Sequence, residues 1–162
     1  MGLFSFIKNA GAKVFGIGKT TEEEAAENAE KAKELANLKA LKLVNAVEAL
    51  GFSVTDLDVT VDGDLATIYG QAENQATRER VVLVVGNTEG IASVDDRMTT
   101  EIQEPEAQFH TVVSGDTLGK IAKTYYSDAM KYPEIFEANK PMLSHPDKIY
   151  VGQVLRIPVL EL

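Results

Sequence analysis

The side chains that could perform acid–base or nucleophilic chemistry are few in this chain. His110 and His145 are its only histidines, and neither has a carboxylate or a nucleophile at a spacing that would suggest a proton relay. We expect His110 to be a surface or edge residue of a strand, and His145, which precedes Pro146, to belong to a loop. The short motifs of serine hydrolases and zinc proteases do not occur in the sequence. The sequence therefore predicts a binding protein rather than an enzyme.

Two patterns that could bind cations or phosphate fail on their spacing. Aspartates surround a predicted hairpin at Asp56, Asp58, Asp62 and Asp64. Their separation is not that of a calcium-binding loop, and aspartate is common in turns. Residues 16–20 resemble the end of a phosphate-binding loop, but Lys13 occupies the position of the first glycine that such a loop needs. The chain has no cysteine, which leaves no disulfide and no thiolate metal site.

The composition limits the possible partners. At 162 residues, the chain is long enough for one ordinary domain or two small ones. Its net charge of −9 produces a negative field, so we expect no nucleic-acid partner. The sequence has no apolar run long enough to span a bilayer. The apolar stretch at its start is too short for a secretory signal, and no cleavage site follows, so we expect a cytoplasmic protein.

An amphipathic segment is expected at residues 1–21. Its apolar residues fall on one face at helical spacing: Leu3, Phe4, Ile7, Ala10, Gly11 and Val14. We expect this face to dock onto the chain's own domains, with a membrane-surface helix as the alternative. The next helix is expected at residues 22–50, where Thr21 and Glu24 form a capping box and Gly51 ends the pattern.

The pattern then changes from helical to alternating. Strands are expected at residues 54–61 and 65–69, joined by the hairpin signal Asp62-Gly63. A helix at 74–85 and a strand at 90–98 follow. This order of helix, strand, strand, helix, strand resembles the BON domain over about residues 38–102. We therefore place a BON-like domain with an extended first helix at residues 22–102, followed by a polar linker at 103–108.

The last third of the chain carries the most specific signature. In residues 112–118, a strand end is followed by a tight turn at Gly115 and a helix start that Asp116 or Thr117 can cap. A second helical pattern and a strand at residues 152–158 complete the unit. These segments resemble the LysM domain, which we place at residues 109–162 as strand, helix, helix, strand. The predicted fold class is α+β.

The whole arrangement, from the Met-Gly-Leu-Phe start through residues 135–143, resembles the family of cytoplasmic bacterial potassium-binding proteins that join one BON and one LysM module. The resemblance implies a monomer that binds K⁺ selectively and becomes compact with the ion bound. Backbone carbonyls suit K⁺, and helix ends and glycine turns such as residues 7–12 and 86–91 can supply them. The ligands that the family implies are the carbonyl oxygens of Ile7, Ala10, Ala12, Gly86 and Thr88.

Two alternatives belong to the cell envelope. A LysM-like module implies binding of N-acetylglucosamine glycans such as peptidoglycan, here by residues of two loops: Gly115, Asp116, Thr117, Leu118, Ile149 and Tyr150. A BON-like module implies attachment to a membrane. Both alternatives conflict with the expected lack of a secretory signal, so K⁺ binding is the preferred hypothesis.

Overall fold

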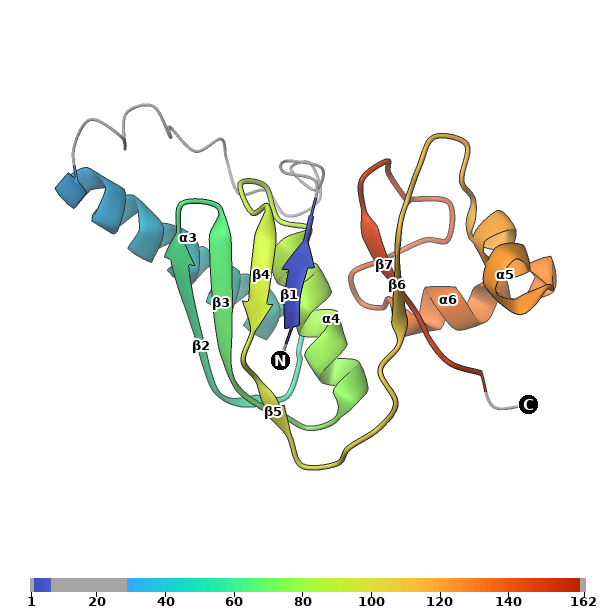
Figure 1. Cartoon of the computed structure of the whole chain (residues 1–162), viewed down its shortest axis with the longest axis horizontal. Helices are drawn as coiled ribbons and strands as arrows, with labels where there is room; N and C mark the ends of the chain where they lie inside the picture. Colours follow the sequence, from blue (N-terminus) through green and yellow to red (C-terminus); the bar gives the residue numbers. More distant parts are fainter. Residues whose placement is uncertain (1, 7–28, 161–162) are drawn as a thin grey trace.

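The computed structural model describes residues 2–6 and 29–160, and it confirms the α+β fold class. A sheet covered on one face by two helices is followed by a smaller unit with a two-stranded sheet and its own helices (Figure 1). The two units lie side by side, with helix α4 between the large sheet and strand β7 of the smaller unit.

The large sheet contains a hairpin and a parallel crossover. Its strands are β1 (Gly2–Ser5), β2 (Val54–Asp62), β3 (Leu65–Ala72), β4 (Ser93–Asp96) and β5 (Thr99–Thr100). The order is β1-β4-β3-β2, with β5 paired to the end of β3. β2 and β3 form the predicted antiparallel hairpin, and β4 lies parallel to β3 because helix α4 crosses over between them.

Two helices cover the sheet, α3 (Ala29–Ala49) and α4 (Gln75–Gly86). Leu43 and Val47 of α3 and Ile68 of β3 are buried in the core between helices and sheet. Helix α4 begins where the sequence predicts, because the Asn74 side chain accepts a hydrogen bond from the Thr77 amide at 2.8 Å. Every residue from 81 to 86 of α4 is buried, which is the pattern of a helix covered on both sides.

The smaller unit follows the predicted strand, helix, helix, strand order. It consists of β6 (Gln108–Thr111), α5 (Leu118–Tyr126), a short 3₁₀ turn η1 (Ala129–Lys131), α6 (Tyr132–Ala138) and β7 (Val154–Ile157). Thr117 caps α5 by accepting a hydrogen bond from the Lys120 amide. Ile121, Ile135 and Leu155 are buried in its core. β6 and β7 pair antiparallel, so the end of β6 lies beside the start of β7.

The expected helix at the start of the chain is wrong for its first residues. Gly2–Ser5 form strand β1, which pairs antiparallel with β4 and extends the sheet. The burial alternates accordingly, since Phe4 and Phe6 are half-buried while Leu3 is 71% exposed. A strand forms here because β4 offers an open edge whose backbone groups need partners. The rest of the predicted segment, and the start of the predicted helix at 22–50, lie outside the described residues.

Gly70 tests the geometry of the hairpin. Its φ of 139° is open almost only to glycine, and an added Cβ would lie 2.8 Å from Val54 Cγ1 and 3.0 Å from Thr55 O. We expect Gly70→Ala to lower the free energy of unfolding in urea by about 1–3 kcal/mol. The matched control is Gly119→Ala, because Gly119 is helical and an added Cβ would lie no closer than 3.9 Å to Ala129 O and Thr117 Oγ1. This change should raise the free energy of unfolding by about 0.4–1 kcal/mol. Equal effects of the two substitutions on the free energy of unfolding would contradict the hairpin geometry.

Candidate functional site

The C-terminal end of α4 is a buried turn that presents main-chain oxygens. The helix ends at Gly86, and the turn continues to Ile91, whose amide donates to Thr88 O at 3.2 Å. Asn87 and Thr88 are 2% and 1% exposed. Carbonyls at a helix C-terminus lack intrahelical partners and carry partial negative charge, so this turn can attract a cation.

The start of the chain reaches this turn. The Phe6 amide donates to Ala92 O at 2.7 Å, and the Phe6 ring packs so closely on Gly86 that an added Cβ would lie 1.9 Å from the ring. Gly86 is therefore required by a close approach of an aromatic ring. Of the predicted ion ligands, Gly86 and Thr88 share this turn, and Phe6 directly precedes Ile7. Ile7, Ala10 and Ala12 lie outside the described residues, so the full ligand set stays a prediction.

Asn87 connects the same turn to the smaller unit. Its side-chain Nδ2 donates to Val154 O and its Oδ1 accepts from Val154 N, both at 2.9 Å. Asn139 makes the same pair of contacts with Arg156, at 2.8 and 2.7 Å. Val154 and Arg156 lie on the edge of β7 that does not face β6. Two asparagine amides thus replace the missing neighbouring strand, and one of them belongs to the residue that directly follows α4.

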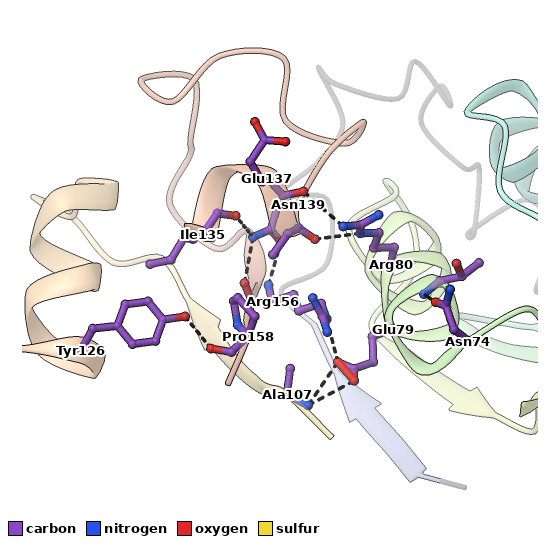
Figure 2. A network of polar contacts seen from close by, with 12 residues as sticks. Asn74, Glu79, Arg80, Ala107, Tyr126, Ile135, Glu137, Asn139, Arg156 and Pro158 are labelled. Atoms are coloured by element: carbon purple, nitrogen blue, oxygen red, sulfur yellow. Dashed lines mark hydrogen bonds and ion pairs between the residues drawn. The ribbon is translucent and has the colours of Figure 1, made fainter. Parts of the chain in front are cut away.

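A buried ion pair joins the two units nearer the start of α4. Arg156 Nε lies 3.0 Å from Glu79 Oε2, with side chains 12% and 5% exposed. The Glu79 carboxylate also accepts the Ala107 amide at 3.1 Å, so the end of the predicted linker is bound to α4 (Figure 2). These partners satisfy a carboxylate that would otherwise be costly to bury.

Arg80 caps a helix of the smaller unit. Its guanidinium donates to the carbonyls of Ala138, at 3.0 Å, and Glu137, at 3.2 Å, which are the last carbonyls of α6 (Figure 2). A cation at a helix C-terminus is favourable because those carbonyls carry partial negative charge. Burial, followed by the charge of Arg156, lowers the pKa of the Arg80 guanidinium.

An aromatic contact links strand β1 to the smaller unit. The rings of Phe4 and Phe109 meet edge to face, with centroids 5.2 Å apart and planes at 89°. Phe4 and Phe6 therefore place the start of the chain against both the smaller unit and the turn at Gly86.

The residues predicted for glycan binding also come together. The antiparallel pairing of β6 and β7 puts their two loops at one end of the small sheet, where Val112 N donates to Gln153 O and Gly152 N donates to Val112 O, both at 2.8 Å. Gly115 turns the chain with a φ of 88°, and Leu118 is buried. The Tyr150 hydroxyl is buried without a hydrogen-bond partner, and burial raises its pKa.

The expectation for His110 needs correction. It is half-buried, with Nε2 2.8 Å from Asp116 Oδ2 and Nδ1 3.1 Å from the Tyr125 hydroxyl, whereas the spacing predicted no carboxylate partner. Hydrogen bonds from the Val113 amide and from His110 hold the pKa of Asp116 below its ordinary value. The tight turn at Gly115 brings Asp116 back against the strand that carries His110. The number of residues between His110 and Asp116 does not reveal this contact.

Sequence reasoning missed the polar contacts between the units. They involve Glu79, Arg80, Asn87 and Arg156. The available signal was the position of Glu79 and Asn87 in and directly after a helix whose other residues are mostly apolar, since such a helix is buried and its polar groups need partners. Among the described residues, no three His, Asp or Glu side chains converge as a metal site, and no helix is long and apolar enough to cross a bilayer.

Comparison with known proteins gives two domain matches. The BON domain family matches residues 40–101, and the LysM domain family matches residues 110–158. The gap between the two matches, residues 102–109, ends within β6.

Individual proteins match at very different lengths. The chain is 42% identical over 158 residues to the potassium binding protein Kbp of Escherichia coli O6:H1, which covers 98% of this chain and 99% of that protein. It is 28% identical over 113 residues to an uncharacterized protein of Deinococcus radiodurans, covering 63% of this chain and 44% of that protein. The secreted LysM effector slp2 of Pyricularia oryzae is 47% identical over 49 residues, covering 30% of this chain and 15% of that protein.

The buried ion pair between the units should matter for stability. We expect Glu79→Ala to lower the free energy of unfolding by about 3–5 kcal/mol, because it leaves the charge of Arg156 buried without its partner. The control is Lys140→Ala, which removes an exposed pair with Glu137 at 2.7 Å and should cost less than about 1 kcal/mol. Urea unfolding followed by circular dichroism measures both. A Glu79→Ala midpoint like that of the control would show that the pair does not form in solution.

The packing of Phe6 on Gly86 gives a second prediction. We expect Gly86→Ala to displace the Phe6 ring and to cost about 1–3 kcal/mol, since the new methyl group occupies the ring's position. Amide hydrogen exchange of Phe6, whose amide is bound to Ala92 O, should accelerate. Phe6→Ala makes room for the methyl group, so Gly86→Ala should cost much less in that background. Additive costs would mean that the ring lies elsewhere.

Proposed function

This chain belongs to the family of the potassium binding protein Kbp, and we propose that it is a non-enzymatic protein that binds K⁺ through main-chain carbonyl oxygens. One observation supports this proposal above the others. The buried turn at the end of α4 holds the carbonyls of Gly86 and Thr88, and Phe6 brings the start of the chain directly against it.

The chemistry of the turn suits a large monovalent ion. K⁺ is weakly hydrated, and carbonyl dipoles can replace its water shell, whereas clustered carboxylates favour smaller or divalent cations. The proposed ligands are the carbonyl oxygens of Ile7, Ala10, Ala12, Gly86 and Thr88. The turn contributes oxygens from a helix C-terminus, whose dipole adds to the attraction.

The proposed response to the ion is compaction. K⁺ would join residues 7–12 to the turn at Gly86 and thereby hold β1 on the sheet. β1 carries Phe4, which packs on Phe109 of the smaller unit, so the ion would favour the arrangement in which the two units touch. The ion can shift this equilibrium only by its higher affinity for the closed form. The proposal includes a monomeric state, a cytoplasmic location and a role as a K⁺ sensor or buffer.

A second candidate function concerns the LysM module alone. The match to the LysM family and the position of both predicted loops at one end of the small sheet favour a site for N-acetylglucosamine oligomers. Chitooligosaccharide titration should then shift the amide signals of Asp116 and Tyr150. Unchanged signals at millimolar ligand would exclude this function.

Titration with KCl and NaCl at matched ionic strength tests K⁺ binding. We expect K⁺ to shift the amide signals of residues 7–12 and 86–91 and to reduce the radius of gyration, because the ion closes the structure. Na⁺ at the same concentration should do neither to a comparable extent. Gly63, in the hairpin turn, provides an internal control whose signal should not move. Equal responses to the two salts would exclude selective K⁺ binding.

A further inference from the structure

We infer that Asn87 is a positioning residue that couples the ion site to the LysM module, so that docking of strand β7 sets the affinity for K⁺. This inference rests on the proposed function and deepens it. It assigns to one buried side chain the connection between the ion ligands and the second domain.

Asn87 lies between the two proposed ligands of the turn. Gly86 and Thr88 are its direct neighbours in the chain, and its own φ of −80° and ψ of 0° set how the peptide planes on either side are oriented. Its amide nitrogen donates to Leu83 O at 2.9 Å, which ties the turn to the end of the helix. Hydrogen bonds that hold the Asn87 side chain in place therefore also restrict the φ and ψ of Asn87. These dihedrals set the directions of the neighbouring carbonyls.

The LysM module provides the hydrogen bonds that hold the Asn87 side chain. The Asn87 side chain forms two hydrogen bonds of 2.9 Å with the backbone of Val154, one as donor and one as acceptor, and this pairing defines the orientation of the amide. Both residues are buried, since Asn87 and Val154 are 2% and 6% exposed. If the module moves away, the paired groups lose their partners and the Asn87 side chain is free to rotate.

The other polar contacts that the structure describes between α4 and the smaller unit lie nearer the start of the helix. Glu79 and Arg80 lie eight and seven residues before Asn87, which at 1.5 Å per residue places them about 10–12 Å away along the helix axis. They hold the LysM module against α4 but do not adjoin a proposed ligand. Among the polar contacts described between α4 and the smaller unit, those of Asn87 belong to both the interface and the turn.

The coupling must act in both directions. If docking of β7 favours the ion-binding form of the turn, then K⁺ favours docking by the same factor. Coupling between two sites in proteins commonly changes an affinity by about 5- to 150-fold. Loss of the Asn87 amide should therefore weaken K⁺ binding without removing any ligand.

Hydrogen exchange in the unmodified chain gives the first test. We expect the Val154 amide, which donates to Asn87, to exchange more slowly in KCl than in NaCl at matched ionic strength. The matched control is the Arg156 amide, which donates to Asn139 within the LysM module at 2.7 Å and should respond much less. Equal protection of Val154 in both salts, or equal changes at Val154 and Arg156, would overturn the inference.

Substitution in the full chain gives the second test. We expect Asn87→Ala to weaken K⁺ binding by at least about 5-fold and to raise the K⁺ concentration needed for compaction accordingly. Arg80→Ala serves as the control, since it removes two hydrogen bonds of the same interface and leaves the turn intact; its effect on K⁺ affinity should be clearly smaller. Circular dichroism verifies that each variant is folded, and the exchange experiment decides the matter if Asn87→Ala is not.

The outcomes distinguish a failure of the role of Asn87 from a failure of the proposed K⁺ binding. Unchanged K⁺ affinity in Asn87→Ala, or an equal loss in Arg80→Ala, would overturn the role of Asn87 while K⁺ binding by the unmodified chain still supports the proposed function. A chain that does not respond to K⁺ at all would overturn both.

Discussion

The burial of helix α4 on two sides is the constraint on which the rest of the structure depends. One side packs on the sheet, and the other meets β7 and α6 of the LysM module. The second half of α4, residues 81–86, is apolar and buried throughout, so the second module has to cover the side that does not face the sheet. The same burial makes Glu79, Arg80 and Asn87 costly unless each finds a partner, and each partner comes from the LysM module or the segment that leads into it.

Strand β1 and the residue after it connect the sheet, the LysM module and the turn at Gly86. The strand completes the sheet beside β4, and its neighbouring aromatic residues contact the LysM module through Phe109 and the turn through Gly86. The end of α4, the start of the chain and the interface between the modules therefore meet in one region. A ligand that orders any of these parts changes the free energy of the others, which is the physical basis for a binding event that alters the shape of the molecule.

The elements with strong local signals were predictable, and those made by distant partners were not. The hairpin at Asp62-Gly63 and the capped starts of α4 and α5 follow from residues within a few positions. β1 was mistaken for part of a helix because four residues carry little periodicity, and its strand form depends on the edge of β4 far along the chain. The partners of His110 were missed for a similar reason, since a turn reverses the chain between His110 and Asp116.

By itself, the sequence determined the α+β class, the order of the elements and the membership of the Kbp family, because local pattern and motif spacing carry that information. It could not derive ion ligands from side chains, since carbonyl oxygens are common to all residues and only resemblance suggested which ones to consider. The tertiary structure alone decided that Gly86 faces Phe6 and that Asn87 pairs with Val154. Such contacts depend on how separate surfaces pack in space, and the packing brings together residues that no local spacing relates.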